Sequence, residues 1–109
     1  MREEIAKLNP QRVWHHFLKI TEIPRQSKNE EKILQYLMEF ARQHNLDYEQ
    51  DKTGNLVIRK PSSADASSKR MVVLQSHVDM VCEKNEDVNF NFDTDPIEPY
   101  FKDGWVKAK

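Results

Sequence analysis

The segment MVVLQSHVDMV, residues 71–81, limits the possible folds of this chain more than any other part of it. Met71–Leu74 is an apolar run rich in β-branched residues, which is typical of a strand that a parallel sheet buries on both faces. The run continues without a turn residue into a polar stretch that carries His77 and Asp79. We therefore expect a buried strand at Met71–Ser76, with an imidazole and a carboxylate near its carboxyl end.

Two helices are predicted before this strand. The first is expected to have Asn9 as its N-cap and Pro10 at its first helical position, and to end before Pro24. The second is expected to begin with a capping box of Ser27 and Glu30, because apolar residues at helical spacing follow this pair. Both apolar stripes are most simply faces that pack on a sheet.

Two hairpins are predicted as well. The sequence YEQDKTGNLVIRK, residues 48–60, reads as two strands joined by a turn at Thr53-Gly54-Asn55. Asp103-Gly104 lies between apolar residues near the end of the chain, which is a strong hairpin signal. A hairpin is therefore expected on each side of the strand in the middle.

The remaining segments predict loops. Residues 61–70, PSSADASSKR, have the composition of a flexible loop. The acidic stretch after Asp79 is irregular, and Pro96 and Pro99 argue against a central strand there. The order of elements, without an internal repeat, predicts one domain over residues 1–109 of the α/β or α+β class.

Composition excludes several classes of function. A net charge of −1 gives no electrostatic footprint for nucleic acid or for an anionic membrane, so neither is expected as a partner. No apolar run is long enough to span a membrane, and no signal-peptide pattern opens the chain. Cys82 is the single cysteine, so a reducing cytoplasm is expected. The two glycines cannot build a glycine-rich phosphate loop.

His77 and Asp79 form the candidate site. On a strand they would share one face, while Ser76 would point to the other, which argues against a Ser-His-Asp triad made of these three residues. A zinc-bound histidine commonly donates its second ring N–H to a carboxylate, so His77 is a candidate metal ligand supported by Asp79. The local pattern leaves a structural pair without metal open, because a catalytic zinc takes about three protein ligands.

Other residues carry weaker hypotheses. Cys82 is a rival nucleophile, but nothing around it resembles a catalytic-cysteine motif. The other histidines have no metal-site partner at suitable spacing, and a structural or solvated role is expected for them: His15, His16 and His44. Six acidic or amide residues fall at the spacing of an EF-hand calcium loop: Asp87, Asn89, Asn91, Asp93, Asp95 and Glu98. Phe92 stands where that loop needs glycine, so a solvated acidic loop is the better interpretation.

The sequence from residue 71 to the end, which contains VVLQSHVDMV, KN, DPI and WVKA in that order, resembles the aminoacyl-histidine (Xaa-His or β-alanyl-histidine) dipeptidases. These belong to the zinc metallopeptidases that include aminoacylase and acetylornithine deacetylase. The resemblance extends upstream through PRQSKNEEKILQYLMEFARQHNL and DKTGNLVIRKP, and so covers nearly the whole chain. The combined motifs are far more specific than His-x-Asp alone. One departure is Phe90-Asn91-Phe92, where members often have His-Asp-Phe.

The resemblance implies an α/β catalytic domain, with helices packed on a mixed β-sheet, of which this chain is the N-terminal part. It implies a pair of zinc ions, with His77 as a ligand of one and Asp79 as a catalytic residue that is not a ligand. The bridging carboxylate and the general base would lie beyond Lys109. The substrate would be a dipeptide with C-terminal histidine.

Two expectations follow for the isolated chain, which would hold an incomplete zinc site. It should be inactive alone, and it should self-associate through the uncovered strand Met71–Ser76. The alternative is a non-enzymatic α/β interaction or regulatory module, in which His77 and Asp79 are structural.

Overall fold

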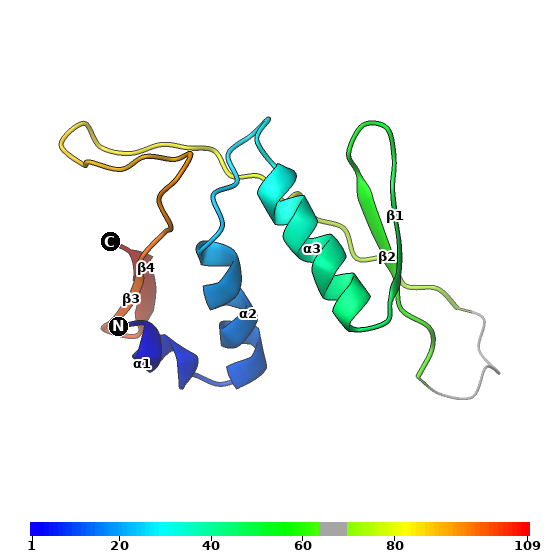
Figure 1. The fold of residues 1–109 in the computed structure, drawn as a ribbon. Coiled ribbons are helices and arrows are strands. Elements are labelled where there is room, and N and C mark those ends of the chain that lie inside the picture. Colours follow the sequence, from blue (N-terminus) through cyan, green and yellow to red (C-terminus); the bar gives the residue numbers. More distant parts are fainter. Residues whose placement is uncertain (64–69) are drawn as a thin grey trace. The chain divides into compact units, whose positions relative to one another are not determined.

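The computed structural model describes residues 1–63 and 70–109, and its contacts divide into two compact units. The first unit comprises Met1–Ile33 and Asp79–Lys109, and the second comprises Leu34–Val78. The predicted loop at residues 61–70 lies largely outside the described residues. The elements, labelled in Figure 1, are α1 (Arg2–Ala6), α2 (Gln11–Thr21), α3 (Glu31–Gln43), β1 (Asp47–Gln50), β2 (Leu56–Arg59), β3 (Pro99–Lys102) and β4 (Trp105–Ala108).

Helix α2 is the main helix of the first unit, and its expected start is wrong by one residue. Pro10, in an extended conformation, is the N-cap, rather than Asn9. Its carbonyl accepts the N–H groups of Val13 at 3.1 Å and Trp14 at 3.3 Å, which is the bonding that an N-cap carbonyl makes. The predicted end is confirmed, because the helix stops at Thr21, before Pro24.

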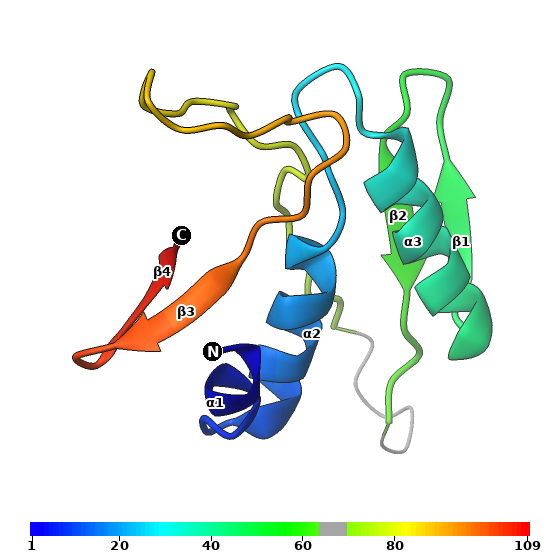
Figure 2. The ribbon, with the colours of Figure 1, turned by 60° about the vertical axis from the view of Figure 1, so that its left-hand side comes forward.

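The short helix α1 was not expected from the sequence, and it packs against α2 and β3 (Figure 2). Ile5 is fully buried in this contact, and Leu18 of α2 is nearly so. The Arg2 guanidinium donates to the Leu18 carbonyl at 2.8 Å and to Glu22 Oε1 at 2.8 Å. Five residues are too few for a stable isolated helix, so these tertiary contacts explain why α1 forms.

Strands β3 and β4 form the predicted hairpin at Asp103-Gly104. The strands are antiparallel, with Lys102 opposite Trp105, so the turn has two residues. Asp103 has φ 53° and Gly104 has φ 77°, as a type I′ turn requires. Pro99 is the first residue of β3, a strand position where its missing N–H is tolerated.

Helix α3 is confirmed, but the capping box predicted for its start is wrong. The helix begins at Glu31, after both residues of the supposed box. The Glu30 carboxylate accepts the backbone N–H of Lys28 at 2.9 Å, and the Ser27 hydroxyl donates to a different segment of the chain. Ser-x-x-Glu therefore belongs to the turn before the helix.

In the second unit, β1 and β2 form the other predicted hairpin, beside α3 (Figures 1 and 2). Asp47 pairs with Arg59, and Gln50 pairs with Leu56. In the turn, the Asp51 carboxylate accepts the backbone N–H groups of Thr53 and Asn55, each at 2.9 Å. Gly54 has φ 102°, a conformation that residues with a side chain rarely adopt.

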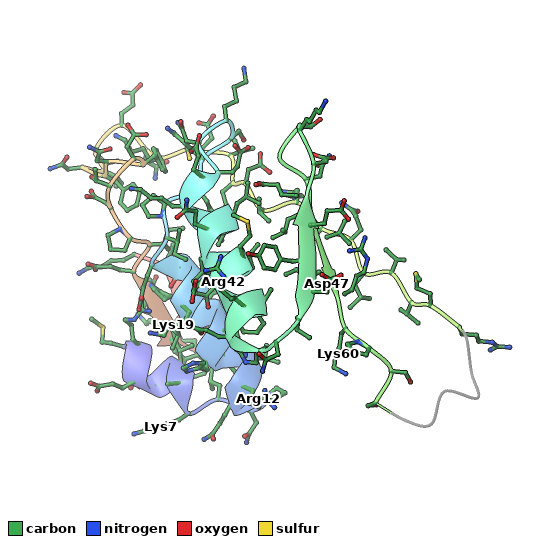
Figure 3. All side chains as sticks on the ribbon, turned by 45° about the vertical axis from the view of Figure 1, so that its right-hand side comes forward. Lys7, Arg12, Lys19, Arg42, Asp47 and Lys60 are labelled. Carbon is green, nitrogen blue, oxygen red and sulfur yellow. The ribbon has the colours of Figure 1, made fainter. Side chains whose placement is uncertain are left out.

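Charged side chains form contacts between β1 and β2 and between α3 and β1. Arg59 forms ion pairs across the strands with Asp47 at 3.2 Å and Glu49 at 3.0 Å. Arg42, which Figure 3 labels on α3 together with Asp47 on β1, donates to the Tyr48 hydroxyl at 2.9 Å. The hydrogen bond to the Tyr48 hydroxyl raises the pKa of Arg42, and the Glu39 carboxylate contributes further. These contacts are exposed, so each contributes little to stability.

The predicted buried strand Met71–Ser76 is wrong for this structure. Residues 71–79 form no strand, and the side chains of Met71–Leu74 are largely exposed, reaching 92% at Leu74. A strand buried on both faces needs hydrogen-bonded neighbours and cover from other elements. In the described part of the chain, strands pair only as β1 with β2 and β3 with β4, so no single mixed sheet forms there. Helices with antiparallel strands still confirm the mixed α and β fold class.

Candidate functional site

Asp79 lies in the first unit, where its segment pairs with the loop that follows α2. The Met80 N–H donates to the Arg25 carbonyl at 2.9 Å, and the Ser27 N–H donates to the Met80 carbonyl at 3.3 Å. These two bonds make an isolated parallel bridge between Gln26 and Met80. The backbone on both sides of the bridge is therefore held in register.

The Asp79 carboxylate has a side-chain partner across this bridge. The Ser27 hydroxyl donates to Asp79 Oδ2 at 2.6 Å. A hydroxyl that donates to an ionised carboxylate makes a short, strong hydrogen bond, and this distance falls in that range. Asp79 is half-buried. One oxygen of the candidate catalytic carboxylate is therefore held by a residue 52 positions earlier in the chain.

Arg25 anchors the same loop to α2. Its guanidinium donates to the Ile20 carbonyl at 2.5 Å, at the end of the helix, while its own carbonyl accepts from Met80. Burial lowers the pKa of Arg25, as expected for a cation removed partly from water. The Thr21 carbonyl accepts the Ile97 N–H at 2.9 Å. The helix end thus connects to the loop and to the segment that leads into β3.

Gln26 and Phe92 line two shallow hollows in this unit. The polar hollow contains Asp93, which accepts a hydrogen bond from Gln26 Nε2 at 2.5 Å, and Lys32, which donates to the Asp93 carbonyl at 3.4 Å. The apolar hollow contains Phe90, whose ring meets that of Phe92 edge to face at 5.0 Å. Both hollows lie beside the Gln26–Met80 bridge: Gln26 lines both of them, and Met80 lines the apolar one.

His77 is exposed and belongs to the second unit. Because residues 71–79 form no strand, the expected shared strand face of His77 and Asp79 does not exist in this structure. The argument that Ser76 points to the opposite strand face from His77 and Asp79 therefore no longer applies. The serine whose hydroxyl contacts Asp79 is Ser27.

The described residues contain no group of three or more His, Cys, Asp or Glu side chains arranged to hold a metal ion. In the acidic loop, the Asn91 side chain accepts the Asp93 N–H at 2.9 Å, and the Asp95 carboxylate accepts the Asn91 N–H at 2.8 Å. These oxygens stabilise local turns. A metal site built on His77 would need ligands from elsewhere.

The chemistry of Cys82 does not favour a nucleophile. Burial raises the pKa of the thiol, and the negative charges of Asp93 and Glu83 raise it further. A raised thiol pKa reduces the fraction of reactive thiolate at neutral pH. Cys82 Sγ lies 3.6 Å from the Met80 carbonyl, beside the bridge, so the side chain fits a packing role.

The other histidines have local contacts. His44 Nδ1 lies 2.9 Å from the Phe40 carbonyl, and its ring stacks on the Phe40 ring with centroids 4.2 Å apart. His15 and His16 meet edge to face at 5.4 Å. These contacts are consistent with the structural or solvated role expected for them.

Sequence reasoning missed that the loop before α3 pairs with the segment around Met80. The sequence pattern predicts a helix cap at Ser27 and indicates no role for Arg25. The signal that could have distinguished a turn from a helix cap is Pro24, the proline before Arg25. A proline followed by polar residues also fits a turn that pairs with another segment. The partner segment is 52 residues away, and no local pattern specifies it.

Known proteins match almost all of this chain, although no protein-family model does. The cytosol non-specific dipeptidase of Escherichia coli strain K12 is 42% identical over 106 residues, which is 97% of this chain and 22% of that protein. The crystal structure of aminoacylhistidine dipeptidase from Vibrio alginolyticus matches with a TM-score of 0.91 and 45% identity, over 96% of this chain and 21% of that one. The chain thus spans about a fifth of the length of these relatives. The resemblance to the aminoacyl-histidine dipeptidases is therefore confirmed in sequence and in fold over nearly the whole chain.

Proposed function

We propose that this chain is part of a larger zinc-dependent dipeptidase of the cytoplasm that hydrolyses dipeptides with C-terminal histidine. The observation that carries the proposal is the agreement with two dipeptidases in sequence and fold. Both relatives are named for dipeptide hydrolysis, which supports the reaction class. One is named for aminoacyl-histidine substrates and the other as non-specific and cytosolic, so the histidine preference has narrower support than the reaction.

In this proposal, His77 supplies one imidazole ligand and Asp79 is a supporting carboxylate. An imidazole nitrogen is a ligand that zinc prefers, so His77 fits the metal by its donor chemistry. Zinc, when bound, supplies Lewis-acid activation of water. The further ligands and a general base would come from outside the residues described here, since those residues hold no group of three suitable side chains.

The isolated chain should consequently be inactive and bind zinc weakly. One imidazole leaves most of a tetrahedral site to water, and such a site does not retain a metal ion. We expect no dipeptide hydrolysis by the purified 109-residue chain. Measurable hydrolysis that copurifies with the chain would contradict this and would direct attention to His15, His16 and His44.

The experiment is a hydrolysis assay of the whole protein with β-Ala-His, Leu-His and Leu-Gly, before and after removal of metal by a chelator. We expect hydrolysis that the chelator abolishes and added zinc restores, with the His-containing dipeptides cleaved faster. Chelator-resistant hydrolysis would overturn the zinc proposal, and equal rates for all three would overturn the histidine preference. Absence of any hydrolysis would favour the non-enzymatic module.

A further inference from the structure

The hydroxyl of Ser27 donates a hydrogen bond to Asp79 Oδ2 at 2.6 Å. Asp79 is the supporting carboxylate of the proposed function, and Ser27 lies 52 residues earlier in the chain. The torsion that orients an aspartate carboxylate has a broad, roughly two-fold energy profile, so the plane of the carboxylate is set by its hydrogen bonds rather than by rotamer preference. A donor to one defined oxygen therefore favours one orientation of the carboxylate plane.

Ser27 is itself well held. Its backbone N–H donates to the Met80 carbonyl at 3.3 Å. On the other side of the bridge, the Met80 N–H donates to the backbone carbonyl of Arg25 at 2.9 Å. Arg25 is anchored to α2 through the Ile20 carbonyl. These hydrogen bonds connect the backbone of Ser27 to the end of helix α2. They hold the Ser27 residue in place beside the Asp79 carboxylate.

We propose that Ser27 is a positioning residue, which orients the Asp79 carboxylate for catalysis through its hydroxyl. The inference rests on the proposed function, because it assigns Ser27 a role in that same site. Ser27 does not ligate metal or contact substrate in this proposal. Residues that orient a supporting group precisely enough for catalysis commonly change rates when removed, even though they do no chemistry themselves.

The catalytic test uses Ser27→Ala and Ser27→Thr in the whole protein. The alanine variant loses the donor, and we expect kcat to fall about 10-fold, the lower end for loss of a supporting hydrogen bond. KM and bound metal should stay near those of the unmodified protein. The threonine variant keeps a hydroxyl at the same position and should recover most of the lost kcat. Ser62→Ala, at an exposed serine, is the matched control and should behave as the unmodified protein.

Two results would overturn the inference on kinetic grounds. One is a kcat for Ser27→Ala within twofold of the unmodified protein. The other is a loss that threonine does not recover and that is accompanied by lower metal content and a lower melting temperature, because that pattern describes a structural role.

A crystal structure of Ser27→Ala, compared with that of the unmodified whole protein, separates this inference from the proposed function. We expect the Asp79 carboxylate to rotate in the variant while the Gln26–Met80 bridge stays. An unchanged carboxylate, or a Ser27 hydroxyl outside hydrogen-bond distance in the unmodified protein, would overturn the positioning role whatever the activity. Absence of dipeptide hydrolysis by the unmodified protein would instead overturn the proposed function.

Discussion

His77 and Asp79 should respond differently to removal in the whole protein. His77→Ala removes a proposed ligand, so both bound metal and activity should fall. Asp79→Ala removes a supporting carboxylate, and activity should fall about 10–100-fold with a smaller loss of metal. Metal analysis together with kcat/KM distinguishes the two. His15→Ala, at an exposed histidine of α2, is the control and should change neither quantity. Equal and complete metal loss in both variants would mean that Asp79 is a ligand.

Cys82 should react slowly. Burial, followed by the charges of Asp93 and Glu83, raises the pKa of its thiol, so less thiolate is present at a given pH than in a free cysteine. We expect alkylation by iodoacetamide at pH 8 to be slower than for a cysteine peptide, and the midpoint of its pH dependence to lie above the ordinary thiol value of about 8.5. A rate equal to that of the peptide would contradict the environment described here.

Individual residues were predictable where their chemistry is local. The absence of a catalytic-cysteine motif predicts a weak nucleophile at Cys82, and its raised thiol pKa agrees with this. The catalytic role of Asp79, which a family resemblance implies, stays a prediction. Ser27 was misassigned because Ser-x-x-Glu has the same letters in a capping box and in the turn seen here. Its hydroxyl bonds to a segment 52 residues away, and the short-range pattern contains no information about that partner.

The hairpins were predictable because their turns require particular residues. Gly54 and Gly104 have positive φ, and no atom lies within 4 Å of where a Cβ would be, so only backbone strain opposes a side chain. Gly54→Ala and Gly104→Ala should each lower the free energy of unfolding by about 1–3 kcal/mol. Urea unfolding of the chain at low concentration measures this. Lys52→Ala, in the first turn, is the control; equal effects of control and glycine variants would show that the strain is not the cause.

The turn of the β1–β2 hairpin should make stability depend on acid. The Asn55 side chain, at 2.8 Å, and then backbone N–H groups hold the pKa of Asp51 below its ordinary value. Ionised Asp51 therefore stabilises the fold above its unfolded-state pKa of about 3.9, and this contribution is lost as the pH falls through the lower folded-state pKa. Asp51→Asn should be less stable at pH 7 and lose less stability on acidification.

Urea unfolding at pH 7 and pH 3 tests this expectation. Glu86→Gln, at an exposed carboxylate, is the matched control and should keep the full acid dependence of the unmodified chain. If Asp51→Asn also keeps it, the hydrogen bonds to the Asp51 carboxylate do not stabilise the hairpin.

Met71–Ser76 shows why one element was not predictable. Its composition favours a buried strand, but burial depends on neighbours, and no strand among the described residues pairs with it. The strand propensities of the residues show that a segment can form a strand, but they do not show whether neighbouring strands are present to pair with it. The hairpins differ because each strand finds its partner a few residues away.

Across the chain, the reaction class was predictable only through resemblance. Charge and composition excluded classes of partner but indicated no enzyme. The combined motifs around His77 identified dipeptidases, and two matching dipeptidases confirm that resemblance. The contact between Ser27 and Asp79 needed the structure, because it depends on how two distant segments pair.

The exposed apolar run should cause the isolated chain to self-associate. Met71, Val72, Val73 and Leu74 are between 78% and 92% exposed. An uncharged, β-branched segment without proline or glycine readily forms strands with copies of itself. We expect the sedimentation coefficient to rise with concentration, as dimers or larger species form. Val73→Lys places a charge in the run and should shift the chain toward monomer.

Val13→Lys is the matched control, because Val13 is also exposed, at 60%, but belongs to helix α2 and not to the run. This variant should associate as the unmodified chain does. If both lysine variants became monomeric to the same extent, the cause would be net charge and not the segment. A chain that stays monomeric at all concentrations, with a sharp cooperative melt, would contradict this prediction. It would show that residues 71–74 do not drive association in solution.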